Sequence, residues 1–178
     1  AFGHKARDIF KNNKQVQIIA CGTSFNAGLV AKYWLEDIAK IPCNVEIASE
    51  YRYRNPLILD KTLFVTISQS GETADTLEAL KTARKINNKI HTLCICNTAE
   101  SSITRESELT FLTHAGPEIG VASTKAFTTQ LVALALLTCS MGVCKKNINK
   151  QSEKVIVDGL KRLPGLINKT LLQENQIK

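Results

Sequence analysis

Short apolar segments and longer amphipathic segments alternate along the chain. Runs of β-branched and other apolar residues, which predict strands, occupy residues 15–21, 44–48, 62–68, 90–96 and 109–113. Helical spacing of apolar residues predicts helices at residues 25–40, 74–86, 101–106, 123–141 and 149–167. Because the strand interiors are apolar on both faces, we expect a parallel sheet that helices cover on both sides.

This alternation predicts an α/β fold, a three-layer sandwich with a five-stranded parallel sheet. Right-handed crossovers leave few strand orders, and we favour the flavodoxin-like order 2-1-3-4-5. The first and third strands are then neighbours, and the helices after them lie on opposite faces, so their loops open into one crevice. We further expect residues 50–60 to form a connector without a helix, and Pro164 to kink or end the last helix.

Length and composition fit one globular domain. The chain has 178 residues, of which 44% are hydrophobic and 22% charged, and this excludes a disordered or collagen-like chain. We divide it into a domain at residues 1–148 and a C-terminal helix at residues 149–178. The net charge of +7 would attract phosphates or other anions. Nucleic acid is not indicated, because basic residues such as Lys145 and Lys150 are typical of a solvated helix face.

Several other classes of site and location are disfavoured. The six cysteines lie mostly in apolar runs and form no CxxC pair, which is typical of buried thiols in the reducing cytoplasm. The histidines are too scattered to predict a metal site, and no nucleotide cofactor is expected because neither GxxxxGK[ST] nor GxGxxG occurs. The N-terminus lacks the apolar run of a secretory signal. Polar residues interrupt the apolar stretch at residues 126–144, so we predict a core helix there and no membrane span.

Two loops rich in small hydroxyl residues follow the first and third predicted strands. The first is Cys21-Gly22-Thr23-Ser24, and the second is Ser68-Gln69-Ser70-Gly71-Glu72-Thr73. At the carboxyl end of a parallel strand, the first amides of the next helix are unpaired, and with the helix dipole they form an anion site. Hydroxyl groups add neutral donors, and Gly71 lets the backbone approach closely. Because both loops meet at one crevice, the sequence predicts a site for a monophosphate.

Capping is the alternative role for these hydroxyl residues, since a Ser or Thr N-cap is worth about 0.5 to 2 kcal/mol to its helix. Glu72 and Asp75 would repel a phosphate, so we expect both to point outward and to serve only the helix dipole. Cys21 invites interpretation as a nucleophile, but no histidine follows nearby, and a packed thiol is the simpler interpretation.

A third loop at residues 116–125 leads into the helix at residues 123–141 and could line the same crevice. Ser123 in this loop is either the cap of that helix or a ligand contact. For Lys125, a solvated surface charge is the alternative to a contact in the crevice.

With these loops identified, the chain resembles the sugar isomerase (SIS) family, and within it the isomerase domains of glutamine:fructose-6-phosphate amidotransferases. The resemblance extends from about residue 9 to residue 166 and rests on the segments ACGTSFNAG, IPCNVEIASEYRYR, SQSGETADTLEAL, RESELTF and EIGVASTKAFTTQ. It implies a flavodoxin-like SIS domain that binds a hexose 6-phosphate, either fructose 6-phosphate or glucosamine 6-phosphate. The implied phosphate contacts are Ser24, Ser68, Gln69, Ser70 and Thr73. The residues implied to face the sugar are Cys21, Gly22, Thr23, Val121 and Ser123.

The resemblance also implies what this chain lacks. The family's enzymes carry a glutaminase domain and a second isomerase lobe, and their proton-transferring base, imine-forming lysine and ring-opening histidine belong to segments after this chain ends. We therefore assign no catalytic residue here and expect the isolated chain to be inert. Pairing of isomerase domains as homodimers is a further implication. A non-catalytic sugar-phosphate sensor remains the alternative function, and a flavin-binding protein would need aromatic residues near the loops, where only Phe25 is available.

Overall fold

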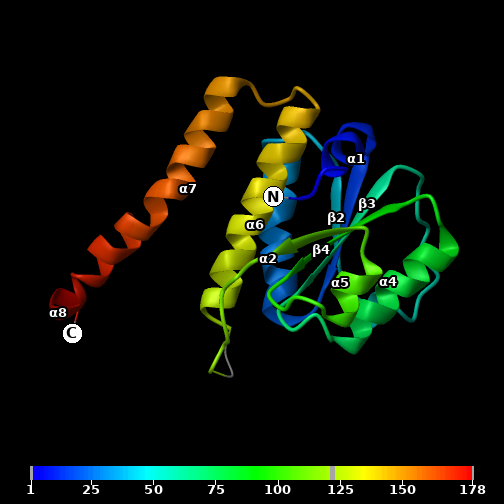
Figure 1. Ribbon diagram of the computed structural model, residues 1–178, viewed down its shortest axis with the longest axis horizontal. Coiled ribbons are helices and arrows are strands. Elements are labelled where there is room, and N and C mark those ends of the chain that lie inside the picture. Colours follow the sequence, from blue (N-terminus) through cyan, green and yellow to red (C-terminus); the bar gives the residue numbers. More distant parts are fainter. Residues whose placement is uncertain (1, 121–122, 178) are drawn as a thin grey trace.

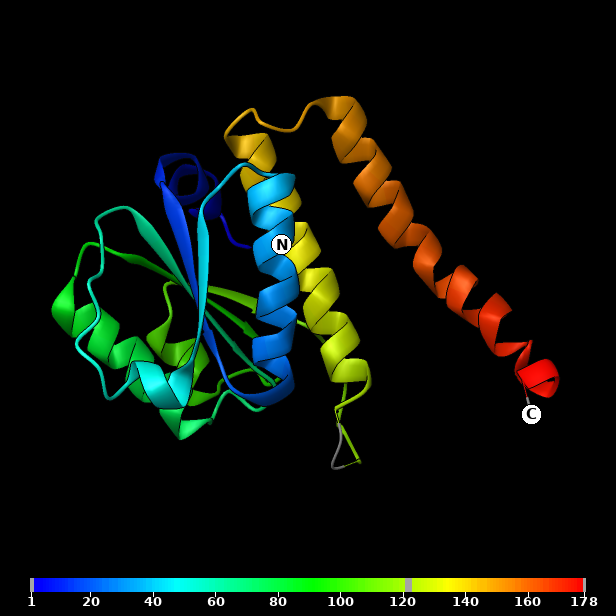
Figure 2. The same ribbon diagram turned by 180° about the vertical axis from the view of Figure 1, so that it is seen from behind.

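The computed structural model describes residues 2–120 and 123–177. It has three layers, with helices on both faces of a central sheet (Figures 1 and 2). The strands are β1 (Gln15–Ala20), β2 (Cys43–Ile47), β3 (Thr62–Ser68), β4 (His91–Cys96) and β5 (Leu109–Leu112). The helices are α1 (Ala6–Asn12), α2 (Gly22–Asp37), α3 (Ala48–Tyr51), α4 (Ala74–Ile86), α5 (Ser102–Glu106), α6 (Lys125–Cys144), α7 (Lys150–Leu171) and α8 (Glu174–Ile177).

The five strands are all parallel and follow the order β2-β1-β3-β4-β5. This confirms the predicted three-layer α/β fold with the flavodoxin-like strand order. The central strand β3 is buried along its whole length. It pairs with β1 so that Ala20 lies opposite Ile67. The loops that follow β1 and β3 therefore begin at the same level of the sheet's carboxyl edge.

Two apolar cores hold the helices against opposite faces of the sheet. On one face, α1, α2 and α6 pack on side chains that include Ile18 and Val65. On the other face, α3, α4 and α5 pack on side chains that include Ile19 and Phe64. Successive strand residues point to opposite faces, so each strand contributes to both cores. The helices after β1 and β3 consequently lie on opposite faces of the sheet, as the sequence predicts.

Two short helices were not expected from the sequence. α1 has seven residues, too few to show a helical period, and it forms because Phe10 is buried against Phe2, with the ring centroids 5.5 Å apart. α3 begins before the segment at residues 50–60 and ends within it, so the expectation of a helix-free connector is wrong at its start. Tyr51 is buried beside Phe64, with ring centroids 5.6 Å apart, and this packing fixes the turn.

Pro164 neither ends the last helix nor limits it to residue 167. α7 continues through Pro164 to Leu171. A proline removes one backbone hydrogen bond, which frees the carbonyl four residues earlier. That carbonyl belongs to Leu160, and residues 161–171 are exposed, so water can satisfy the freed group.

α6 is long and apolar enough to span a membrane by length and composition. In the fold it lies beside α2 and also contacts α1 and β4. Its residues Ala133, Leu134, Leu137 and Met141 are fully buried in the core on this face. This packing explains why the helix is apolar, and it matches the predicted core helix.

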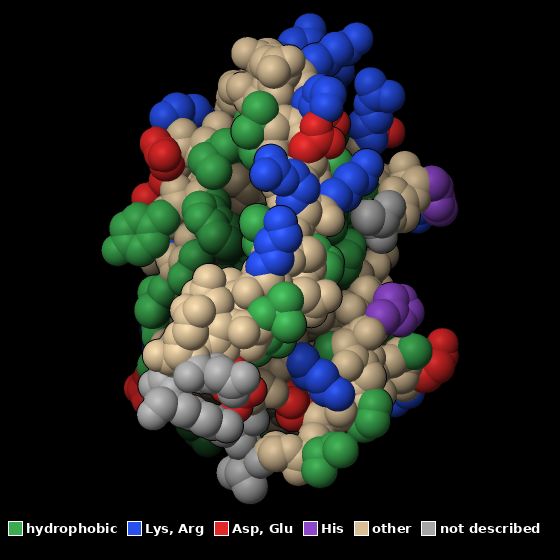
Figure 3. Space-filling view, turned by 90° about the vertical axis from the view of Figure 1, so that its left-hand side faces the viewer, with side chains coloured by type: hydrophobic (Ala, Val, Ile, Leu, Met, Phe, Trp, Pro, Cys, Tyr) green, Lys and Arg blue, Asp and Glu red, His purple; other side chains and the backbone are tan. Residues whose placement is uncertain are grey.

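α7 lies apart from the body of the domain. After a turn that follows α6, it runs beside the domain and contacts it mainly through α6 (Figures 1 and 2). None of the residues of α7, all of which are described, is buried. The molecular face on which α7 lies exposes hydrophobic and basic side chains together (Figure 3). An amphipathic helix of this kind has an apolar stripe available for packing.

Candidate functional site

The carboxyl edge of the sheet brings the two hydroxyl-rich loops together. β1 and β3 are hydrogen-bonded neighbours in the sheet. Their paired residues Ala20 and Ile67 directly precede the first and the second loop. α2 and α4 then leave on opposite faces. The N-termini of both helices therefore lie at the carboxyl edge of neighbouring strands, which is the position where parallel α/β sheets bind ligands.

The first loop turns directly into α2. Cys21 is the N-cap and is extended, while Gly22 has a φ of +57° that favours glycine. The side chain of Cys21 makes no capping bond. The first helical hydrogen bond is donated by Phe25 N–H to the Cys21 carbonyl over 3.3 Å. The amides of Gly22, Thr23 and Ser24 precede that bond and face the carboxyl edge as donors. Gly22 and Thr23 are exposed, Cys21 is half-buried and Ser24 is buried.

The second loop folds its hydroxyl groups onto its own backbone. Ser68 Oγ accepts a hydrogen bond from Gly71 N–H at 3.0 Å and lies 3.0 Å from Thr73 Oγ1. Ser70 Oγ accepts from Glu72 N–H at 3.2 Å. Thr73 is the N-cap of α4, yet its side chain makes no capping bond. Simple capping of α4 by Thr73 is therefore not the arrangement found.

These contacts leave hydroxyl protons for a ligand. A hydroxyl has one proton and two lone pairs, so an oxygen that accepts an N–H can still donate its own proton. Ser68 and Ser70 each accept a backbone N–H, and Ser68 and Thr73 share one proton between their two oxygens. Ser70 is exposed and Thr73 half-buried, whereas Ser68 is buried at the strand end. The loop thus keeps O–H groups that can donate to an anion.

α5 and the residue after β4 donate backbone hydrogen bonds to the second loop and thereby brace it. Ile103 N–H donates to the Gly71 carbonyl at 3.1 Å, and Asn97 N–H donates to the Gln69 carbonyl at 3.2 Å. Gly71 has a φ of +68°, and a Cβ added there would stand 2.0 Å from Ser101 Oγ. Only glycine fits between the loop and its brace. Gln69 itself is half-buried.

The acidic residues of the second loop turn away from its hydroxyls, but their role is larger than predicted. Glu72 Oε1 accepts from Ser102 N–H at 2.7 Å, and its hydrogen bonds to Ser102 hold the pKa of this carboxyl below its usual value. Asp75 forms an ion pair with Arg52 over 2.6 Å. The expectation that both serve only the helix dipole is therefore wrong: Glu72 anchors α5, and Asp75 anchors the segment after β2.

The third loop is held at both ends by residues that the sequence did not single out. Asn97, at the end of β4, donates through Nδ2 to the Gly116 carbonyl at 2.8 Å and accepts from Ala115 N–H at 2.7 Å. Glu118 accepts from Ala126 N–H at 3.1 Å and from the Thr124 hydroxyl at 2.9 Å. These bonds hold the pKa of Glu118 below its usual value.

Glu118 therefore caps α6, and of the two roles considered for Ser123 the capping role is wrong. The N-cap residue is Thr124, and its side chain makes no capping bond of its own. Ser123 is half-buried at the start of this helix. Val121, also predicted to contact the sugar, lies outside the described residues.

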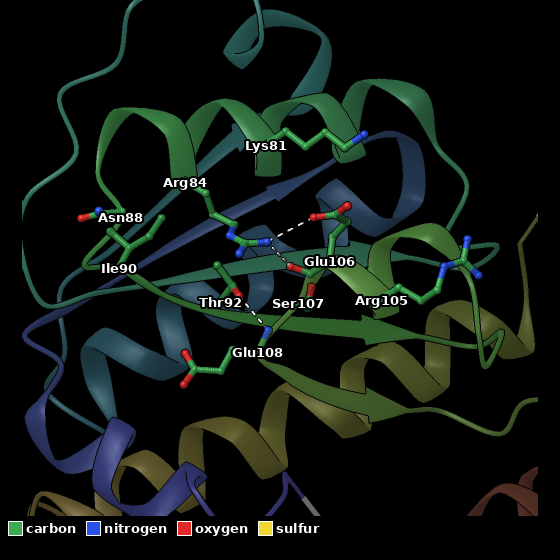
Figure 4. A pocket seen from close by; sticks show the side chains of 9 residues that line it. All are labelled: Lys81, Arg84, Asn88, Ile90, Thr92, Arg105, Glu106, Ser107 and Glu108. Carbon is green, nitrogen blue, oxygen red and sulfur yellow. Dashed lines mark hydrogen bonds and ion pairs between the residues drawn. The ribbon is translucent and has the colours of Figure 1, made fainter.

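A separate cavity of about 610 Å³ lies at the opposite, amino edge of the sheet, where Thr92 and Glu108 line it. Three basic side chains reach it, but Arg84 is bound to the carbonyl and carboxylate of Glu106 at the end of α5. Figure 4 shows the Arg84 guanidinium turned toward Glu106, while Arg105 extends away from that pair. The carboxyl ends of α4 and α5 face this cavity, and such helix ends disfavour anions. The amino-edge cavity is therefore a weaker candidate for the predicted anion site than the carboxyl edge.

Metal ligands do not converge at either place. Across the described ranges 2–120 and 123–177, no group of three or more His, Cys, Asp or Glu side chains could hold a metal ion. The six cysteines are all free, and burial raises the pKa of the Cys43 thiol to about 12. The backbone amides at the two helix N-termini are donors that suit an anion.

Comparison with known proteins identifies the fold family. The SIS domain family matches residues 9–140. The chain belongs to the SIS domain family. The two loops and the crevice lie within the matched part, whereas α7 follows it.

Close relatives of this SIS domain include segments of aminotransferases. It is 55% identical over 178 residues to the glutamine–fructose-6-phosphate aminotransferase (isomerizing) of Pseudomonas syringae pv. tomato, and 50% identical over 177 residues to that of Francisella tularensis. The chain spans 29% of the length of each. Among solved structures, the C-terminal domain of glucosamine-fructose-6-phosphate aminotransferase from Francisella tularensis matches with a TM-score of 0.94 and 50% identity. That match covers 99% of this chain and 49% of the solved one.

Proposed function

We propose that this SIS domain is the phosphate-binding lobe of an isomerase domain in a glutamine–fructose-6-phosphate aminotransferase, and that its ligand is a hexose 6-phosphate. One observation carries the proposal. Two helix N-termini follow neighbouring strands at the same edge of the sheet, and the hydroxyls of Ser68 and Ser70 beside one of them accept backbone N–H groups. A phosphate dianion needs several donors on one side, and this edge supplies amides and O–H groups together.

The proposed contacts divide between phosphate and sugar. For the phosphate they are Ser24, Ser68, Gln69, Ser70 and Thr73. For the sugar they are Cys21, Gly22, Thr23, Val121 and Ser123. Exposure supports this division at the first loop, where Gly22 and Thr23 are accessible and Cys21 is half-buried. We assign no catalytic residue in this chain, and propose a cytoplasmic enzyme as the setting.

We also propose that α7 leads to a second lobe and packs on it. The apolar residues of α7 recur at helical spacing in one stripe, at Ile156, Leu160, Leu163, Ile167 and Leu171. All five are half-buried or exposed in this chain. The solved Francisella domain is about twice the length that this chain matches, so the relative has further structure beside such a lobe. We propose that isomerase domains of this kind pair as homodimers.

The phosphate site is tested by the double variant Ser70→Ala/Thr73→Ala. Each hydrogen bond from a hydroxyl to a charged phosphate is worth about 1.5 to 3 kcal/mol. We expect isothermal titration calorimetry to show weaker binding of fructose 6-phosphate, glucosamine 6-phosphate and inorganic phosphate, with little change in melting temperature.

The control is Ser107→Ala, because the Ser107 hydroxyl donates to the Ile103 carbonyl near the amino edge of the sheet. That variant should bind as the wild-type chain does. A double variant that loses stability and keeps its affinity would show that Ser70 and Thr73 serve the loop alone, and would contradict the proposal.

A further inference from the structure

Gln130 is a buried polar residue of α6 that contacts the first loop from a distant part of the chain. It is 3% exposed, and its Nε2 donates to Ser24 Oγ over 3.0 Å. α6 lies beside α2 in both views of the fold (Figures 1 and 2), which brings together two residues that are 106 positions apart. Ser24 is in the first turn of α2, among the free amides of the proposed anion site.

The amide of Gln130 is costly where it lies. Its Oε1 is buried and has no hydrogen-bond partner among the described residues. An apolar side chain of similar size would avoid that unsatisfied acceptor. The neighbouring buried positions of α6, Ala133 and Leu134, are apolar and belong to the core. Packing alone does not explain the polar amide at this position, so we expect its role in the hydrogen bond that it makes to Ser24.

The hydrogen bond from Gln130 makes the Ser24 oxygen an acceptor of one N–H and leaves its proton free. An amide NH₂ donates, so it occupies a lone pair of Ser24 Oγ and leaves the serine proton to be donated elsewhere. Within residues 2–120 and 123–177, no acceptor for that proton is found. Ser68 and Ser70 are set in the same way by backbone N–H groups. For Ser24 the donor is a side chain, so it can be changed without altering the loop.

We propose that Gln130 is a positioning residue that holds Ser24 as a hydrogen-bond donor toward the bound phosphate. This inference rests on the proposed function and deepens it. Ser68 and Ser70 each accept a backbone N–H and keep a proton that a phosphate dianion can accept. Gln130 produces the same arrangement at Ser24 in the first loop. It acts through Ser24 and does not itself contact the ligand.

The test replaces Gln130 by methionine, which keeps the length of the side chain and removes the amide. Without the Nε2 donor, the Ser24 hydroxyl is free to rotate away from the ligand. We expect inorganic phosphate and fructose 6-phosphate to bind about 3- to 10-fold more weakly, the range of one hydrogen bond. Gln130→Glu should weaken binding further at a pH above the pKa of the new carboxyl, which burial raises, because the ionised group would accept the Ser24 proton and repel the phosphate.

Gln15→Met is the matched control. Gln15 Nε2 donates to Thr62 Oγ1 over 2.7 Å, the same kind of bond between β1 and β3 at the amino edge of the sheet. Its loss should leave the phosphate dissociation constant unchanged. Calorimetry on the folded chain, with melting temperatures measured in parallel, separates affinity from stability.

A double-mutant cycle separates positioning from a merely structural role. If Gln130 acts through Ser24, Gln130→Met should have no further effect on affinity in a Ser24→Ala background. Equal losses in both backgrounds would overturn the inference, as would a Gln130→Met chain with wild-type affinity. A wild-type chain that binds no phosphate would instead overturn the proposed function, and the inference with it.

Discussion

Gly71 meets two separate restrictions at the centre of the second loop. Its φ of +68° disfavours any side chain, and a Cβ there would also overlap Ser101 Oγ at 2.0 Å and Cys96 Sγ at 2.8 Å. Gly22 meets only the first, because its φ is +57° and an added Cβ would have nothing within 4 Å among the described residues. The two glycines thus form a natural pair for comparison.

Gly71→Ala should lower the free energy of unfolding by about 2 to 4 kcal/mol, because backbone strain and overlap with the brace add together. Gly22→Ala should lower the free energy of unfolding by only about 1 to 2 kcal/mol, because it adds backbone strain at a positive φ and no overlap. Urea denaturation of both variants measures the difference. Equal losses would mean that α5 and β4 move aside freely and do not brace the loop.

Glu118 gives the domain a specific acid sensitivity. Its hydrogen bonds, first from Ala126 N–H and then from Thr124, lower its pKa in the folded chain from the ordinary value of 4.5. A carboxyl with a lowered folded pKa contributes stability that is complete above its unfolded pKa and is lost as pH falls through the folded value. The cap of α6 should therefore weaken in acid.

Glu118→Gln removes this titration and keeps an oxygen acceptor. Between about pH 5 and pH 3, the unfolding free energy of the variant should fall less steeply with decreasing pH than that of the wild-type chain. Thermal unfolding followed by circular dichroism across that range measures both slopes. Parallel slopes would show that the Glu118 carboxylate is not held by α6.

Single residues also show how far the site could be predicted from the sequence. The hydroxyls of Ser68, Ser70 and Thr73 were identifiable because they follow a strand directly and precede a helix. Gln130 was not, since its partner is 106 positions away and only the packing of α6 on α2 joins them. Glu118 was missed for a related reason: it caps α6 from six residues before Thr124, outside the usual capping spacing.

Among the secondary-structure elements, the strands were predictable and the shortest helices were not. The order of the strands followed from parallel pairing and right-handed crossovers, which do not depend on details of packing. α1 and α3 exist because Phe10 and Tyr51 are buried by distant partners. α7 passes Pro164 because the helix is solvated there. Each difference arises from the surroundings of an element rather than from its own sequence.

The short helix α5 supports the second loop. It has five residues, yet two amides from its first turn, those of Ser102 and Ile103, bind Glu72 and Gly71 of the second loop. Ile103 is fully buried in the core beneath α4. The loop therefore rests on a fixed support, which is what a preorganised anion site requires.

At the scale of the whole molecule, we expect the exposed stripe of α7 to promote self-association. Leu163 and Ile167 lie on that stripe and are 37% and 46% exposed. In a longer protein we propose that a second lobe covers them; in the 178-residue chain a second copy is the available partner. Light scattering coupled to size-exclusion chromatography should show a dimer or larger species at micromolar concentration.

The variant Leu163→Lys/Ile167→Lys should shift that species to the monomer. Leu57→Lys/Leu59→Lys is the matched control, because these leucines are also exposed, at 86% and 52%, and lie outside α7. It should leave the oligomer unchanged. A wild-type chain that is monomeric at every concentration would contradict the proposed role of α7 as a docking surface.

The central claim is that two loops from neighbouring strands bind one phosphate group together. A ¹H–¹⁵N correlation spectrum of the chain titrated with inorganic phosphate and then with fructose 6-phosphate tests it most directly. We predict that the amides of residues 22–24 and 70–75 shift together and fit one dissociation constant for each ligand. Shifts confined to one loop, different constants for the two loops, or shifts centred on Lys81 and Arg105 at the amino edge would contradict the account.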